Sequence, residues 1–153
     1  MPKHKLQKVL LNQMNLFPVG NKTFIEKNKN WNLEINAKWN SRRINLSITS
    51  KKLNFNKEFI PFSIKKAPFL SFIARYNNYK FYGKSSRVSD LFLESPFAQN
   101  LLISRKANIE LNHKNWIYKG QIRRKDKTSL SNIFILIERL NEQIDLLIDK
   151  RVT

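Results

Sequence analysis

Hydrophobic and polar residues alternate most regularly between positions 31 and 39. The apolar members of this segment lie on one side of an extended chain: Trp31, Leu33, Ile35, Ala37 and Trp39. The polar residues between them lie on the other side, which predicts a strand with one buried face. The pattern recurs over residues 44–48, and the Asn-Ser-Arg sequence between the two segments favours a hairpin turn.

Other segments predict strands from weaker patterns. Residues 72–84 are expected to form a hairpin that turns at Asn77-Asn78, because Asn tolerates the left-handed backbone of a two-residue turn. Residues 108–111 and 116–123 predict a further hairpin. Thr23 to Glu26 predicts an edge strand. Residues 53–64 predict an irregular connection with one or two short strands, since prolines interrupt the region.

Three segments show helical patterns. Apolar residues at helical spacing predict a long amphipathic helix over 129–149, with Thr128 or Ser129 as its cap. Ser95-Pro96 is typical of a helix start, and this helix is expected to span about 95–104. Residues 1–17 form an amphipathic segment, which is either a short helix packed on the domain or a basic membrane anchor or transit segment.

These elements predict an α+β fold in a single domain covering residues 1–153. Residues 22–127 are expected to be mainly β, forming an antiparallel sheet of several hairpins. The short N-terminal helix, the middle helix and the long C-terminal helix are expected to pack on one face. The other face is polar, as in a sheet with water on one side. Strand parity places all three tryptophans in the core: Trp31, Trp39 and Trp116.

The chain is strongly basic, with 29 Lys and Arg against 11 Asp and Glu in 153 residues and a net charge of +18. Such a charge indicates a polyanionic partner: nucleic acid, an anionic membrane or an acidic protein. The alternative explanation is an A/T-rich coding bias, because the chain has 20 Lys and 19 Asn but only 9 Arg. RNA binding predicts basic side chains gathered on one surface, whereas a compositional bias predicts an even scatter.

The charge is unevenly distributed along the chain. Residues 1–80 hold 16 Lys and Arg and 3 acidic residues, whereas residues 81–153 hold 13 and 8. The predicted C-terminal helix is acidic, with a net charge of −3, so a polyanion is expected on the N-terminal and middle strands. The carboxylate pairs Glu138/Glu142 and Asp145/Asp149 are expected to be solvated, or to dock against a basic partner or the protein's own sheet.

Several classes of site lack the residues they need. The chain has no Cys, two His and three Gly, which excludes disulfides, thiolate metal sites and cysteine nucleophiles. We therefore expect no catalytic residue, no metal and no cofactor. No apolar run is long enough for a transmembrane helix, and the expected compartment is the cytoplasm or an organelle interior.

The candidate binding residues are basic and aromatic side chains of the predicted strands and turns. In the second predicted hairpin, Arg75, Lys80 and Tyr82 share the face turned away from the apolar side, and Lys84 follows them. Arg75 opposite Lys80 is a like-charge pair that an anion would relieve. The remaining candidates are two basic pairs: Arg42 with Arg43, and Arg123 with Arg124.

The leading hypothesis is a non-catalytic RNA-binding or ribosome-associated protein. Its basic side chains would neutralise phosphates and release counterions, with limited stacking of unpaired bases on Tyr82 and Tyr118. The alternative is a protein-interaction or structural accessory domain of a larger assembly, whose partner binds the acidic C-terminal helix or the open sheet face. An enzyme with a dispersed site and a protein bound to anionic membranes are further alternatives.

Overall fold

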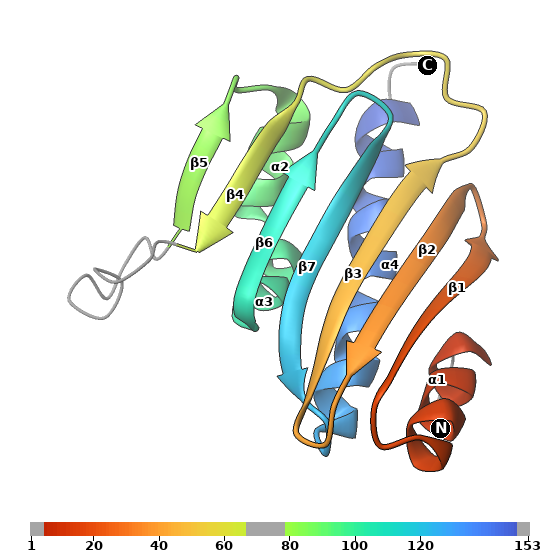
Figure 1. Cartoon of the computed structure of the whole chain (residues 1–153). Helices are drawn as coiled ribbons and strands as arrows, with labels where there is room; N and C mark the ends of the chain where they lie inside the picture. The colour runs from red at the N-terminus through yellow and green to blue at the C-terminus, as the bar shows by residue number, and fades with distance from the viewer. Residues whose placement is uncertain (1–4, 67–78, 150–153) are drawn as a thin grey trace.

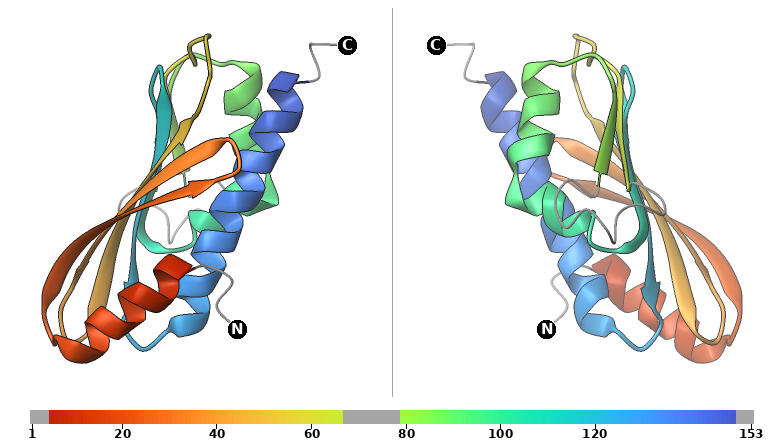
Figure 2. Two further views of the ribbon diagram at one scale, coloured as in Figure 1. Left: turned by 90° about the vertical axis from the view of Figure 1, so that its right-hand side faces the viewer. Right: turned by 90° about the vertical axis from the view of Figure 1, so that its left-hand side faces the viewer.

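The described chain has two layers, a seven-stranded sheet and a layer of helices over one of its faces (Figure 1; Figure 2). The computed structural model describes residues 5–66 and 79–149. Figure 1 looks onto the uncovered face, with α4 behind the sheet. We call the uncovered side the outer face and the side that packs on the helices the inner face.

Neighbouring strands are antiparallel throughout, and their order is β1-β2-β3-β7-β6-β4-β5. Their bounds are β1 (Gly20–Asn28), β2 (Trp31–Trp39), β3 (Arg43–Lys52), β4 (Phe62–Lys66), β5 (Tyr79–Gly83), β6 (Arg105–Leu111) and β7 (Asn115–Arg123). β3 and β7 are far apart in sequence but adjacent in the sheet. The outer face therefore combines residues from both halves of the chain.

The β2–β3 hairpin confirms the clearest sequence pattern. The five alternate apolar residues of β2 are buried, and Trp39 lies opposite Ile44 across the turn. The side-chain oxygen of Asn40 accepts hydrogen bonds from the backbone N–H groups of Arg42 and Arg43, at 2.8 and 2.9 Å. This Asx turn holds the register of the two strands.

The β6–β7 hairpin is also confirmed and uses the same kind of turn. The side-chain oxygen of Asn112 accepts hydrogen bonds from the backbone N–H groups of Lys114 and Asn115, at 3.2 and 3.0 Å. β6 begins earlier than predicted, at Arg105. A bulge follows, in which Lys106 has a φ of 57°.

The predicted hairpin over 72–84 is only partly described, because residues 67–78 lie outside the described residues. Its second strand is β5, which pairs with β4 so that Phe62 lies opposite Gly83. The irregular stretch expected over 53–64 contains one short strand, β4, at its end. The edge strand expected over Thr23 to Glu26 is the longer β1.

The helices in the described part of the chain are α1 (Lys5–Leu16), α2 (Arg87–Glu94), α3 (Pro96–Leu101) and α4 (Lys127–Asp149). They confirm the predicted α+β class, with a short N-terminal helix and a long C-terminal helix. α1 buries Leu10 and Met14 in the core, in agreement with a packed helix. α4 crosses the inner face diagonally (Figure 2).

Two helical features differ from the sequence prediction. The pattern does not predict α2, whose capping box places Ser89 rather than Glu or Gln opposite the cap residue Ser86. Ser95 then ends α2 and caps α3, which stops at Leu101 instead of near 104. The residue that caps α4 is Asp126 and not Thr128 or Ser129.

The cap of α4 shows why its start was misplaced. The Asp126 carboxylate accepts hydrogen bonds from the Ser129 N–H at 3.0 Å and from the Ser129 hydroxyl at 2.6 Å. Ser129 therefore lies in the first turn of α4, and its hydroxyl reinforces the cap. These two hydrogen bonds lower the pKa of Asp126.

The three tryptophans are buried, as strand parity predicts. Each indole N–H donates to an acceptor in or next to the helical layer: Trp31 to Asp145, Trp39 to the carbonyl of Phe17, and Trp116 to the side-chain oxygen of Asn141. Because buried donors without partners are costly, these bonds fix how the helices sit on the sheet.

Candidate nucleic-acid interface

Charge is divided between the two layers of the molecule. Within the described elements, the strands contain 13 Lys and Arg and 3 Glu, whereas the helices contain 5 Lys and Arg and 6 Asp and Glu. The basic excess of the described elements therefore belongs to the sheet.

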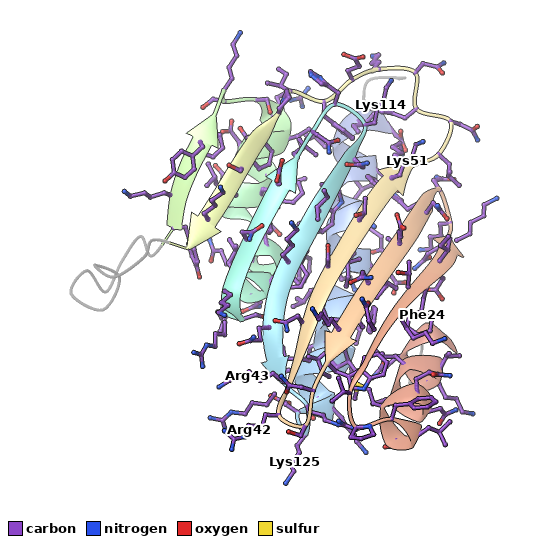
Figure 3. All side chains as sticks on the ribbon, in the orientation of Figure 1. Phe24, Arg42, Arg43, Lys51, Lys114 and Lys125 are labelled. Atoms are coloured by element: carbon purple, nitrogen blue, oxygen red, sulfur yellow. The ribbon has the colours of Figure 1, made fainter. Side chains whose placement is uncertain are left out.

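The outer face carries most of the basic side chains of the strands. Alternation against the buried positions, together with the strand registers, places nine of the described cations there: Lys27, Lys38, Arg43, Lys51, Lys65, Lys80, Arg105, Lys119 and Arg123. Glu34 and Glu110 are the acidic residues on this face of the described strands. Figure 3 shows the face along its length, with Lys51 and Arg43 at opposite ends of β3.

An open groove of about 300 Å³ lies near the centre of the outer face. Its lining combines lysines with side-chain amides: Lys38, Lys106, Lys119, Asn36, Asn45, Asn108 and Gln121. Two of these amides are held together, since Gln121 donates to the side-chain oxygen of Asn45 at 2.8 Å. The groove therefore offers cations for phosphate groups and amides for hydroxyl groups or base edges.

Arginines converge at one end of the face. Arg43 and Arg123 are directly opposite each other on β3 and β7. Arg105, on the next strand, lies opposite Gln121, two residues from Arg123. Two of the predicted residues, Arg43 and Arg123, are therefore adjacent, and Arg42 is exposed in the neighbouring β2–β3 turn.

Arg124, also a predicted binding residue, is used inside the protein. Its guanidinium donates to the carbonyls of Pro18 at 2.6 Å and Asn40 at 3.0 Å, and also to those of Met14 and Phe17. These bonds attach the end of α1 to the β2–β3 turn. We therefore leave Arg124 out of the proposed interface.

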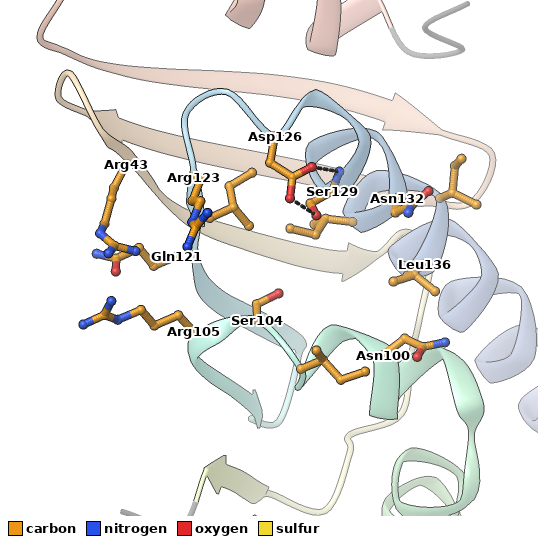
Figure 4. A pocket seen from close by; sticks show the side chains of 14 residues that line it. Arg43, Asn100, Ser104, Arg105, Gln121, Arg123, Asp126, Ser129, Asn132 and Leu136 are labelled. Atoms are coloured by element: carbon orange, nitrogen blue, oxygen red, sulfur yellow. Dashed lines mark hydrogen bonds between the residues drawn. The ribbon is translucent and has the colours of Figure 1, made fainter.

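A pocket of about 700 Å³ opens beside the three arginines (Figure 4). Its other walls come from the end of α3, the turn before β6 and the first turns of α4. In Figure 4, Arg43, Arg105, Arg123 and Gln121 lie on one side of the pocket, and the capped start of α4 lies on the other.

The second predicted cluster lies at the opposite edge of the sheet. Tyr82 is 50% exposed on β5, and the Lys65 ammonium lies 5.9 Å from the centre of its ring. Lys80 is opposite Lys65, and Lys84 is exposed just after β5. Arg75 lies outside the described residues. The expected pairing of Arg75 with Lys80 therefore lies outside the described residues.

β6 and β4 separate this edge cluster from the arginines of β3 and β7. The two groups of predicted residues share one face without touching. The sequence did not predict the central groove, which is lined by β2, β3, β6 and β7, although its Lys38 and Lys119 follow the alternation of their strands. The alternation is visible in the sequence, but the order of the strands that brings these residues together is not.

The expectation that Tyr118 stacks on bases is wrong. Its side chain is fully buried on the inner face of β7, because residue 118 has the same parity as the core residue Trp116. Burial raises the pKa of Tyr118 to about 12.

The acidic side of α4 is partly occupied by the protein's own basic residues. Asp145 forms an ion pair with Lys52 of β3. Its half-buried carboxylate also accepts the hydrogen bond from the Trp31 indole. Glu142 pairs with Lys29 at 3.3 Å and Arg139 at 3.2 Å. Burial raises the pKa of Glu142, but these two cations outweigh it, so the pKa is lowered overall. Glu142 and Asp145 therefore contact basic residues of the protein's own sheet and its turns, which was one of the alternatives expected from the sequence.

Among the described residues, no group of His, Asp and Glu side chains is arranged to hold a metal ion. No helix in the described ranges is long and apolar enough to cross a membrane. His113 is exposed in the β6–β7 turn, 3.6 Å from Glu58.

No family model, curated protein or solved structure matches this chain.

Proposed function

We propose that this chain is a non-catalytic RNA-binding protein of the ribosome-associated kind, acting in the cytoplasm or an organelle interior. Lys and Arg of the outer face bind backbone phosphates, and Tyr82 stacks on an unpaired base. The observation that carries this proposal is the separation of charge between the sheet and the helices. A coding bias raises Lys throughout a chain, but it does not sort acidic residues onto the helical layer.

The polar residues of the outer face favour RNA over DNA. The amides of Asn45 and Asn108 stand among the lysines of the central groove, where they can donate to and accept from ribose 2′-hydroxyls. DNA is commonly read by a basic helix in the major groove. The longest described helix, α4, is instead acidic and packs on the sheet.

The test is fluorescence-anisotropy binding to a structured RNA, a single-stranded RNA and DNA of the same sequence, from about 50 to 300 mM salt. We expect RNA binding that persists at physiological salt and is tighter than DNA binding. In a Lys38→Gln/Lys119→Gln variant, the affinity for single-stranded RNA should fall roughly tenfold near 0.15 M salt. The slope of log K against log salt should decrease by about 1.4, since each phosphate contact contributes about 0.7.

The matched control is Lys8→Gln/Lys57→Gln, which removes the same charge from exposed positions on the helical side. If the outer face is the interface, this control retains nearly full affinity. Equal losses in the two variants would mean that binding reflects net charge alone, and the proposal would then be withdrawn. Circular dichroism establishes that both variants are folded, and anionic vesicles separate RNA binding from membrane binding.

The alternative is an accessory domain that binds a protein partner. It has less support at the acidic helix, because Glu142 and Asp145 already have basic partners. RNA binding that vanishes by about 150 mM salt would favour this alternative, and the open sheet face would then be its first candidate surface.

A further inference from the structure

The arginine-lined pocket is a notch in the end of the sheet. β6 starts at Arg105, opposite Gln121, so the last two residues of β7 extend beyond it. Those residues pair with β3 on one side. On the other side, the pocket is bounded by Ser104 and the start of α4. Its volume of about 700 Å³ lies within the range of about 300–1,000 Å³ typical of small-ligand sites.

The three arginines of this notch have no protein partner among the described residues. Arg124 donates to backbone carbonyls and Arg139 pairs with Glu142, but the guanidinium groups of Arg43, Arg105 and Arg123 form no ion pair or side-chain hydrogen bond. The charge of Arg123 also lowers the pKa of Asp126, but it does so less than the two hydrogen bonds from Ser129.

Arg43 opposite Arg123 also places two like charges on side chains that leave the sheet roughly 5 Å apart. An anion held between these side chains removes that repulsion. Guanidinium groups bind phosphate oxygens through paired N–H donors, so several arginines in one site favour a phosphate over a single carboxylate.

The charge of the lining matches a terminal phosphate. Three arginines and Asp126 give a net charge of +2, and a phosphomonoester carries about −1.5 to −2 at neutral pH. An internal phosphodiester carries a single negative charge and leaves part of the lining uncompensated.

The remaining walls suit a nucleoside attached to that phosphate. Ile103, Ile133 and Leu136 supply an apolar surface, and Ile103 is 66% exposed at its position in the lining. Asn100 and Asn132 add exposed amides. Apolar contact with a base and hydrogen bonds to its edge are the usual means of holding an unpaired nucleotide.

We infer that this notch binds the terminal phosphate of an RNA strand, with the last nucleoside against the apolar and amide walls. The rest of the strand then lies along the outer face. This inference rests on the proposed RNA-binding function, but it concerns one end of the ligand, so it can fail separately.

The test compares oligoribonucleotides of one sequence that carry a 5′-phosphate, a 3′-phosphate or hydroxyls at both ends. Binding is measured by competition against a labelled RNA at constant salt, and adenosine monophosphate and inorganic phosphate are titrated separately by NMR. We expect one of the phosphorylated ends to bind roughly tenfold more tightly than the unphosphorylated strand.

Three variants locate the effect. Arg43→Gln/Arg105→Gln should reduce the preference for the phosphorylated end to about one. Asp126→Asn retains a good helix cap and removes the negative charge of the notch, so it should increase the preference about two- to fivefold. The control Lys27→Gln/Lys51→Gln removes two distant charges of the same face. It should weaken all RNAs alike and leave the preference unchanged.

Each outcome separates the two claims. Equal binding of phosphorylated and unphosphorylated RNA by the wild-type protein overturns the end-binding inference and leaves the RNA function standing. A preference that survives Arg43→Gln/Arg105→Gln places the site elsewhere and also overturns the inference. Absence of RNA binding together with adenosine monophosphate shifts at the notch supports the phosphomonoester site and refutes the RNA function. Absence of both refutes both.

Discussion

Gly120 lies beneath the ring of Tyr118 on the inner face of β7. A Cβ built on residue 120 would lie 2.0 Å from the Tyr118 hydroxyl oxygen and 2.6 Å from the adjacent ring carbon. Non-bonded heavy atoms attract at about 3.5–4.0 Å, so the ring would have to move by about an ångström or more. The ring is fully buried, so moving it would disturb the packing of the core around it.

We therefore expect Gly120→Ala to destabilise the protein. In a strand without a close neighbour, the same change would stabilise the fold by about 0.5–1 kcal/mol, because glycine is the more flexible residue in the unfolded chain. Overpacking a filled core costs about 1–3 kcal/mol. The cost of the clash is the larger effect, so the net change in stability is a loss. The melting temperature of a chain of this length should fall by roughly 2–12 °C.

The assay is urea denaturation followed by circular dichroism, in three backgrounds that progressively remove the obstacle. The penalty of Gly120→Ala should be largest with Tyr118, smaller with Tyr118→Phe, which lacks only the hydroxyl, and reversed in sign with Tyr118→Val. If Gly120→Ala stabilises the wild-type background, or if the penalty is the same with Tyr118 and with Tyr118→Phe, the assigned packing of the ring over residue 120 is wrong.

Two further predictions concern buried polar groups. Asn141→Leu leaves the indole N–H of Trp116 without its acceptor at 2.8 Å. A double-mutant cycle with Trp116→Phe, measured by urea denaturation, should therefore give a coupling energy of about 1–3 kcal/mol. A coupling energy near zero would contradict this hydrogen bond. Burial raises the pKa of Tyr118 from 10.0 to about 12. The contribution of the neutral phenol to the free energy of unfolding is therefore complete below about pH 10 and is lost as the pH rises towards 12. Between about pH 10 and 12, the free energy of unfolding should fall about 1 kcal/mol per pH unit more steeply than in Tyr118→Phe. The same dependence on pH in both proteins would refute this prediction.

The strands with strict alternation were readable from the sequence, because parity along a strand is a local property. Trp31 to Trp39 specify one buried face without reference to any partner, and the Asn40 turn follows directly. The same reasoning identified α4 from its apolar spacing. It failed at α2, whose capping box uses Ser89 in place of the usual Glu or Gln, and at the cap of α4, where Asp126 and Ser129 act together.

Strand parity also predicts that Tyr118 is buried. Residues 116 and 118 share one face of a strand, so a buried Trp116 implies a buried Tyr118. Basic residues were harder to assign, because a guanidinium in a turn has the same sequence signature whether it binds a ligand or its own backbone. Arg123 and Arg124 are adjacent in sequence, yet the first lines the notch and the second holds carbonyls of α1 and the turns beside it.

The sequence by itself determined the α+β class, the buried tryptophans and the polar character of one sheet face, because these follow from side-chain periodicity and burial of apolar surface. The order of the strands depends on pairings between distant segments, which local patterns do not encode. That order alone placed β3 beside β7 and Arg43 opposite Arg123, and it brought Arg105 of β6 to the same pocket. The central groove and the notch exist only in the folded chain, since each combines residues from strands that meet through tertiary pairing.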